Sequence, residues 1–588
     1  MSTGTDAEQI YSIFHNQATD ASGKYNAADW AWVADSNGTS YSDRITVNTT
    51  PLKQQFIDYQ SAYLAVPMTI KSSSEATGST RVLEAPVLNG QNTAVAPFVA
   101  YTGQYIDPTV MYPIFRDSVL SLISGLILQT DSGQVLINES GRLSFINNIR
   151  LKVEHSIDWV DSNGALLHFA LDTAPAAAST IGTATQLYSN SDINEFGYSR
   201  EASTTTALRF PASATSAAPG LVTATTTSTA HIPYRNPAYN AGALKRVQFM
   251  INSITTGERT STSGTIYCTT AKIPLRLLHD LFEQMDFPVF NVGFNFTFML
   301  AQANGDTNSS PSLNQHTPLM LAGPGVGTAA ATSTVLGRGA VTTTLLSAGV
   351  KAPCILYGNA PGAISANACR LYYRTVKFSP ADNARISEQM QKGFTKKIKF
   401  LSTDYNQVNS STFPPTSGLC LITNSVVAPM RVWALCYADK GAGNSPWGGV
   451  LQGGIGGAVG DACVCSTQTV QNGFKNTNIL INNQPYFKLA YQTADDFWVA
   501  LRDQFNRNTG SMLKYTDFVA GGFRYHCFDI SRLSDRLSSI TEAVSLSIQT
   551  DWINTIPCDT LFLIERLNQL SFHFSSSDVN IVLGNPSV

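Results

Sequence analysis

The sequence has little charge. Only 13% of its 588 residues are Asp, Glu, Lys or Arg, about half of the usual ~25%. The 38 basic and 41 acidic side chains nearly cancel, which leaves a formal net charge of -3. No overall positive field is therefore available to attract a nucleic acid or an anionic membrane. A surface of small polar residues suits packing against other protein surfaces, where an unpaired buried charge is costly.

Long apolar runs and targeting signals are also missing. The longest apolar run, residues 119–128, is about half of a membrane span and contains Ser121, Ser124 and Gly125. We therefore expect no transmembrane segment, and the N-terminus lacks the basic and apolar regions of a secretory signal. The nine cysteines include no C-x-x-C pair. They are typical of reduced, buried thiols in a protein that matures inside a cell.

Motifs for catalysis or cofactor binding are absent. The glycines around Gly453 match neither G-x-G-x-x-G nor a phosphate-binding loop, and no H-E-x-x-H occurs. His526-Cys527 as a catalytic or metal pair is weaker than strand packing, and Cys463-x-Cys465 alone is a weak metal site. Asp495-Asp496 is better explained as a helix N-terminus than as an acid/base pair. We predict no enzyme, and no catalytic, cofactor-binding or metal site.

Nucleic-acid binding has little support. Residues 1–50 are mostly polar and contain only Lys24 and Arg44 as basic side chains, so they are not a polycationic arm. One basic cluster occurs between Lys392 and Lys399, with Lys396 and Lys397 between them. It could contact phosphate, but lysines that protect an edge strand are the simpler interpretation.

The first half of the chain has a β pattern. Residues 56–66 predict a strand buried on one face. Residues 119–128 and 134–138 predict a hairpin whose turn uses Gly133. Alternation of Ile149, Leu151 and Val153 with charged residues predicts a strand with one wet face.

A helix followed by a phenylalanine-rich strand is the most informative segment. Leu275, Leu278 and Leu281 fall on one face of a predicted helix over residues 273–285. From residue 290 the period changes to two, and phenylalanines fill one face of the strand through residue 300. A ligand box is possible, but a core stripe covered by a second layer is favoured.

The second half repeats this organisation. Strands are predicted at 371–378, 398–401, 419–437, 479–482, 523–528, 544–548, 560–566, 571–574 and 581–583. Asp495-Asp496 opens a helix with Phe497, Leu501 and Phe505 on one face. One short helix in each β half favours duplicated architecture.

We therefore predict an all-β protein with two tandem halves, short helices and long loops. The expected division is an arm at 1–50, a first half at 51–300, a linker at 301–350, and a second half with a C-terminal tail at 351–588. Loop excursions rich in small residues are expected at about 171–242 and 438–466.

Four phrases resemble the double jelly-roll major capsid proteins of small double-stranded DNA viruses, closest to virophages and Polinton-like viruses. They are residues 55–64 (QFIDYQSAYL), 273–282 (IPLRLLHDLF), 478–487 (NILINNQPYF) and 523–532 (FRYHCFDISR). Their order and spacing carry the resemblance, because each phrase alone is weak.

This resemblance implies a major capsid protein in the virion shell, assembled inside the host cell. Each half would be an eight-stranded jelly roll, and three chains would form a pseudo-hexagonal capsomer. Capsomers would tile an icosahedral shell around a double-stranded DNA genome. The implied partners are other copies of the chain, neighbouring capsomers, and penton and minor or cement proteins.

Other classes remain open at this point. A viral fibre or carbohydrate-binding β-sandwich is also polar and rich in loops, but shaft repeats and a clustered sugar site are not evident. A single-jelly-roll capsid protein with a projecting domain is the nearest structural alternative. A secreted β-rich hydrolase would need a paired acid and base.

Overall fold

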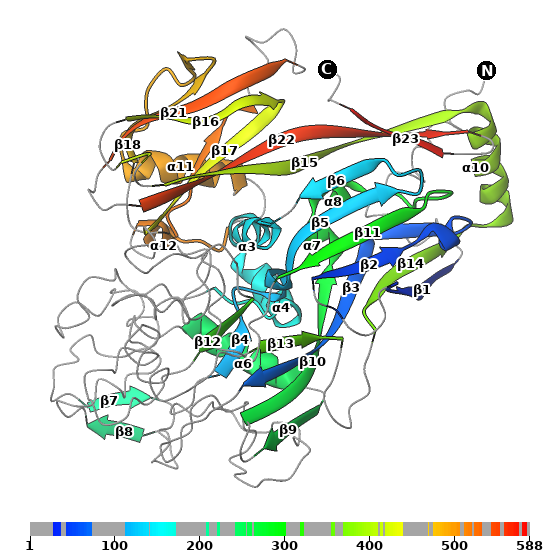
Figure 1. Cartoon of the computed structure of the whole chain (residues 1–588), viewed down its shortest axis with the longest axis horizontal. Coiled ribbons are helices and arrows are strands. Elements are labelled where there is room, and N and C mark those ends of the chain that lie inside the picture. The colour runs from blue at the N-terminus through cyan, green and yellow to red at the C-terminus, as the bar shows by residue number, and fades with distance from the viewer. Residues whose placement is uncertain are drawn as a thin grey trace.

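The chain folds into two β-sandwiches, shown by a computed structural model (Figure 1). The structure describes residues 27–36, 41, 43–72, 112–139, 141–171, 207–210, 220–223, 241–253, 256–260, 264–301, 318–322, 354–358, 368–409, 412–414, 418–438, 469, 474–505, 511–519, 523–531, 542–552, 558–575 and 579–584. Structural statements below refer to these residues.

The first sandwich pairs two antiparallel sheets. Its main strands are β1 (Ala27–Ala34), β2 (Arg44–Asn48), β3 (Phe56–Ser72), β5 (Ile123–Thr130), β6 (Val135–Glu139), β10 (Gly264–Pro274), β11 (Phe294–Leu300) and β14 (Arg370–Lys377). One sheet has the order β1-β14-β3-β10, and the other has the order β2-β11-β5-β6. β9 (Thr256–Thr260) and β13 (Cys354–Tyr357) extend the first of these sheets.

The second sandwich has the same plan. Its main strands are β15 (Phe394–Val408), β16 (Gly418–Val427), β17 (Pro429–Ala438), β18 (Phe474–Ile481), β19 (Gln484–Pro485), β20 (His526–Asp529), β21 (Ala543–Trp552) and β22 (Cys558–Phe574). The two sheet orders are β15-β22-β17-β20 and β16-β21-β18-β19, and β23 (Val579–Gly584) pairs with β22.

The strand orders of the two halves coincide. Numbered along each half, strands 1, 8, 3 and 6 form one sheet and strands 2, 7, 4 and 5 form the other. This is the two-sheet jelly-roll connectivity. The predicted all-β fold with two tandem eight-stranded jelly rolls is therefore confirmed.

Helices fill the connections. α3 (Leu143–Glu154) and α4 (Ile157–Leu167) follow the fifth strand of the first half, and α11 (Ala494–Phe505) and α12 (Tyr515–Val519) follow the fifth strand of the second. The other helices are α6 (Ala241–Ser253), α7 (Leu275–Leu278), α8 (Asp280–Gln284) and α10 (Pro380–Lys392), with 3-10 turns at Thr50–Leu52 and Val119–Leu122. The minor ribbons are β4 (Tyr112–Phe115) with β12 (Leu319–Ala322), and β7 (Ala207–Phe210) with β8 (Gly220–Thr223).

The helix predicted over residues 273–285 does not occupy the same place in the first half as α11 does in the second. The sequence paired the helix after Ile273 with the helix at Asp495, but α7 and α8 follow the sixth strand. The counterpart of α11 is α3, over residues that alternation predicted as a strand. That prediction is wrong because α3 is buried on two sides. Ile149 and Val153 pack in the second core, whereas Leu151 packs in the first.

The phenylalanine-rich strand was predicted correctly apart from its start. Phe294, Phe296 and Phe298 are fully buried on one face of β11, which confirms a core stripe. The strand begins at residue 294, after Asn291, whose φ of 59° interrupts the extended backbone, and Gly293, which lies against the turn at Thr50. A Cβ at Gly293 would lie 2.8 Å from the Thr50 Cα. The hairpin at Gly133 is confirmed, with φ of 86° at that residue.

Two boundaries differ from the sequence division. β1 and β2 lie within the segment predicted as an arm. The sequence pattern missed them because Trp30 and Trp32 alternate with small residues and the five-residue β2 is too short to show a clear period. β13 and β14 pair with β3, so residues 354–357 and 370–377 belong to the first sandwich by hydrogen bonding. We therefore propose that the two halves divide at α10. The predicted loop excursions lie largely outside the described residues, as do Cys463 and Cys465.

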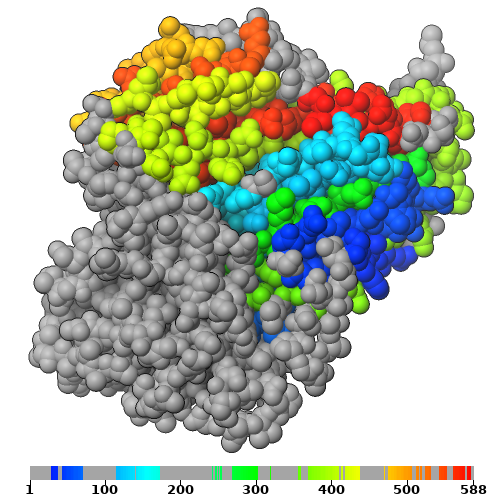
Figure 2. All heavy atoms as spheres, in the orientation of Figure 1, coloured from blue at the N-terminus to red at the C-terminus, as the bar shows by residue number. Residues whose placement is uncertain are grey.

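The two sandwiches lie directly against each other. Figure 2 shows the cyan segments of the first half in contact with the yellow-green and red segments of the second. Within the described ranges, no helix is long and apolar enough to cross a membrane.

Candidate functional site: the junction of the two sandwiches

The edge of a sheet is covered at the junction. β15 is an edge strand, and its outward N–H groups would otherwise be free to pair with another chain. The Leu401 N–H donates to Asp280 Oδ2 at 2.6 Å, and the Thr403 N–H donates to Glu139 Oε1 at 2.9 Å. Two carboxylates of the first sandwich therefore cap the edge of the second.

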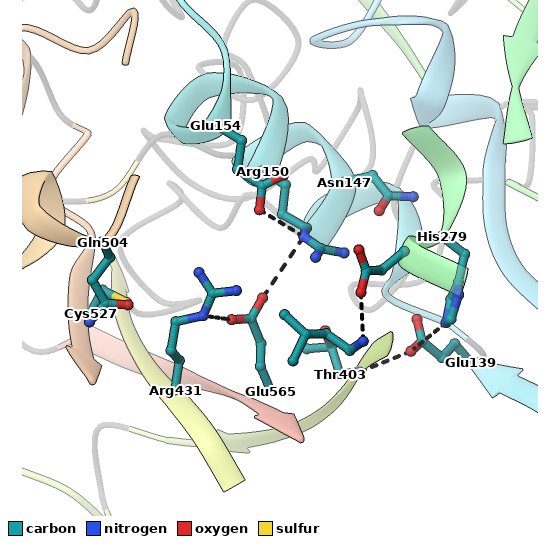
Figure 3. Close-up of polar contacts among 12 residues, drawn as sticks. Glu139, Asn147, Arg150, Glu154, His279, Thr403, Arg431, Gln504, Cys527 and Glu565 are labelled. Atoms are coloured by element: carbon teal, nitrogen blue, oxygen red, sulfur yellow. Dashed lines mark hydrogen bonds and ion pairs between the residues drawn. The ribbon is translucent and has the colours of Figure 1, made fainter. Parts of the chain in front are cut away.

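Glu139 is held in place by a histidine (Figure 3). His279 Nδ1 accepts a hydrogen bond from the Leu281 N–H, so the neutral ring carries its proton on Nε2. Nε2 lies 3.2 Å from Glu139 Oε1 and donates to it. Burial raises the pKa of Glu139, but His279, the Thr403 N–H and Arg150 outweigh it and hold the pKa below the ordinary value. The carboxylate form is therefore favoured.

A second carboxylate links the sandwiches through arginines. Arg150 on α3 places its Nε 3.2 Å from Glu154 Oε1 and 3.8 Å from Glu565 Oε1 on β22. Arg431 on β17 places its Nε 2.5 Å from Glu565 Oε2. Burial lowers the pKa of Arg150, but the nearby carboxylates of Glu154, Glu565 and Asp280 raise it above the ordinary value. Glu565 is 1% exposed, so these two arginines, rather than water, surround its carboxylate.

Apolar packing also joins the two sandwiches. Phe145, Ile149 and Val153 of α3 belong to the hydrophobic core of the second sandwich. In the other direction, Phe572 packs in the first core, and its ring centroid is 5.4 Å from that of Phe287. Such continuous cores are typical of permanent interfaces.

The basic cluster is divided among structural roles. Lys392 pairs with Glu388 on α10, and Lys396 lies 3.4 Å from Asp286 and 5.5 Å from the Phe287 ring centroid. Lys397 and Lys399 are exposed on the edge strand β15. This placement supports edge protection rather than a phosphate site.

The residues weighed for catalysis have packing roles. His526 is enclosed by aromatic rings, and its Nδ1 lies 3.3 Å from the Ala434 carbonyl oxygen. Burial, together with Arg524, lowers the pKa of His526 to about 3. Burial also raises the pKa of the Cys527 thiol well above its usual value, so it is not an activated nucleophile. The interpretation as strand packing is confirmed.

Asp495 and Asp496 serve the start of α11, as predicted, although the cap lies two residues earlier. The Thr493 hydroxyl accepts from the Asp496 N–H, and Asp496 Oδ2 accepts from the N–H groups of Gln492 and Thr493. Asp495 accepts from the Tyr515 hydroxyl. In the part of the chain that the structure describes, no three His, Cys, Asp or Glu side chains form a metal cluster.

The junction residues could not be selected from sequence. Glu139 and Thr403 are 264 positions apart, and Asp280 and Leu401 are 121 apart. None forms a motif, and only the packing of the two sheets brings them together. The duplicated architecture, predicted from one short helix in each β half, was the one usable signal, since it implies two bodies that must meet.

The geometry defines a double jelly roll, and a solved chain from a virophage has a similar fold. A chain in the 3.5 Å cryo-electron microscopy structure of the Sputnik virophage matches with a TM-score of 0.52 and 11% identity, over 96% of this chain and 90% of that chain. The mavirus major capsid protein gives a TM-score of 0.45 and 8% identity, over 95% and 90% of the two chains. The Faustovirus major capsid protein gives 0.41 and 10%, over 97% and 98%.

No family model and no curated protein matches this sequence. The resemblance predicted from the four phrases is therefore confirmed for the fold, through the Sputnik chain.

Proposed function

We propose that this chain is a major capsid protein, located in the shell of a virion. The observation that carries the proposal is the repeated strand order of its two sandwiches, combined with a match over 96% of the chain to a virophage chain. A fold alone does not fix a function. The low charge, and the burial of His526 and Cys527 with pKa values shifted toward their neutral forms, support a structural role.

We further infer a homotrimer. Three chains with two sandwiches each would place six similar bodies in a pseudo-hexagonal ring, and such rings could tile an icosahedral shell. Closed rotational symmetry removes sheet edges that would otherwise pair without limit. A double-stranded DNA genome, penton and minor or cement proteins, and assembly inside the host cell belong to the same proposal.

The test is the mass and outline of the purified protein. Light scattering should give three times the chain mass of 63.3 kDa, and negative-stain images should show a six-lobed outline. A protein that stays monomeric at all accessible concentrations would contradict the proposal.

The alternatives can be separated. A single jelly roll with a projecting domain is contradicted by the two sandwiches of equal topology. A carbohydrate-binding β-sandwich would be favoured by micromolar binding on a glycan array by protein that does not self-associate. A hydrolase would be revived by turnover of a labelled substrate.

A further inference from the structure

An aromatic and basic surface lies open on the first sandwich. On the outer face of β1, Trp30 is 56% exposed and Trp32 is 49% exposed. The Arg370 guanidinium carbon lies 4.3 Å from the Trp32 ring centroid. Tryptophan and arginine are the residues most enriched in the energetic centres of protein interfaces.

The neighbouring strands continue this surface. Trp30 packs on Tyr63 of β3 with ring centroids 5.7 Å apart, and Tyr63 stacks on Tyr372 of β14 at 5.0 Å. Arg374 pairs with Trp30 in the register of β14 and β1 and is exposed. Asp58 lies opposite Arg374, but its Oδ1 accepts from the N–H groups of Gln60 and Ser61. We call Trp30, Trp32, Tyr63, Arg370, Tyr372 and Arg374 the aromatic face.

The equivalent face of the second sandwich is already covered. β1 and β14 are strands 1 and 8 of the first half, and β15 and β22 are strands 1 and 8 of the second. Outside this face lie Phe287 of the first sandwich, whose ring centroid is 5.4 Å from that of Phe572 on β22, and Arg150 of α3, whose Nε is 3.8 Å from Glu565 Oε1. The chain therefore covers this face once, and leaves the duplicate open.

The shared strand order of the two halves also indicates which element should cover the open face. In the covered contact, the helix after the fifth strand, α3, faces the neighbouring sandwich. Its counterpart is α11, whose core face consists of Phe497, Leu501 and Phe505. On the opposite side Val499 is 48% exposed, and the exposed carboxylates of the helix are Asp495, Asp496 and Asp503, against one exposed guanidinium, Arg502.

We propose that the aromatic face of one copy binds the α11 face of the second sandwich of another copy. The acidic helix complements Arg370 and Arg374, and Val499 packs against the tryptophans. The contact joins different surfaces, so it is head-to-tail and generates a ring when the rotation closes. This inference rests on the proposed capsid function and names the surfaces through which its copies join.

The first experiment is the paired substitution Trp30→Ala and Trp32→Ala in the full chain. Its matched control is Leu419→Ala with Leu421→Ala. Those leucines are 61% and 48% exposed, two positions apart, on the edge strand β16. Sedimentation velocity over a concentration series should show self-association weakened on the order of 100-fold or more by the tryptophan pair, and by less than about 3-fold by the leucine pair.

The second experiment tests the partner surface by charge reversal. Arg374→Glu and Asp503→Arg should each weaken self-association about 10-fold, and the double variant should recover most of the loss. Hydrogen exchange of the wild-type oligomer, compared with the dissociated chain, should show slower exchange in both residues 27–34 and residues 494–505. Circular dichroism and thermal unfolding of each variant check that the fold is retained.

The outcomes separate this inference from the capsid proposal. If wild type forms a trimer and the tryptophan variant forms it equally well, the inference is overturned while the capsid proposal stands. Protection of residues 27–34 without residues 494–505 would also overturn it, because another surface would then be the partner. A wild-type protein that is monomeric at every concentration would remove both proposals.

Discussion

Arg150 of the first sandwich and Glu565 of the second face each other across the junction, with Arg150 Nε 3.8 Å from Glu565 Oε1. Arg431 approaches the same carboxylate from within the second sandwich. One buried carboxylate therefore stands between two largely buried guanidinium groups. Its geometry ties the orientation of α3 to β17 and β22.

Replacing Glu565 by Gln should destabilise the protein strongly. The change leaves two largely buried guanidinium groups without their shared anion, and breaking such a buried pair costs about 3–5 kcal/mol. Denaturant unfolding followed by tryptophan fluorescence measures the loss. The control is Glu388→Gln, whose carboxylate pairs with Lys392 on the exposed surface of α10 and should change stability little. Equal effects of the two substitutions would contradict a structural role for the junction pair.

Protonation of Glu139 should lower the stability of the fold in acid and leave it unchanged near neutral pH. Burial raises the pKa of this carboxyl, but His279, the Thr403 N–H and Arg150 hold it below the unfolded value. Its stabilisation is therefore complete above the unfolded pKa of about 4.3 and is lost as the pH falls through the folded value. Comparing unfolding midpoints of wild type and Glu139→Gln from pH 7 to pH 3 isolates this carboxyl. Their difference should be constant down to about pH 5 and should shrink below it.

His526 should make the stability of the fold depend on pH in a higher range than Glu139 does. Burial, followed by Arg524, lowers the folded pKa of this histidine to about 3. The unfolded side chain takes up a proton near pH 6.5, whereas the folded one stays neutral, so stability falls as the pH drops from about 6.5. One such group contributes a slope of about 1.4 kcal/mol per pH unit. His526→Phe, surrounded by Phe474 and Phe497, should reduce the measured slope between pH 6 and pH 4.5 by about one proton, and an unchanged slope would show that His526 is charged in the fold.

The sequence was sufficient where one face of an element is buried. Alternation located β11, β21 and the start of β3, and helical spacing located α11, because each presents a single apolar face to one core. It failed for α3, whose apolar residues serve two cores, and for Trp30 and Trp32, whose apolar rings face outward.

The junction itself was beyond local pattern. Asp280 and Glu139 act on backbone N–H groups of β15, and a backbone donor leaves no trace in the sequence of the strand that carries it. The assignment of β14 failed for a related reason. Its apolar alternation shows that it is a strand, but its partner is set by the register with β3 and β1, which lie more than 300 positions away in the printed sequence.

Gly293 should be intolerant of any side chain, although it lies in a segment whose alternation treats it as an ordinary outward position. A Cβ there would lie 2.8 Å from the Thr50 Cα, which is backbone and cannot rotate away. Gly293→Ala must therefore shift the turn at Thr50 against β11, and overpacking of this kind costs about 1–3 kcal/mol. Gly584→Ala is the matched control, since a Cβ at that position meets no atom within 4 Å. Thermal unfolding should show a midpoint below that of the wild type for Gly293→Ala and an unchanged midpoint for Gly584→Ala. Equal midpoints for the two variants would mean that the turn adapts without strain.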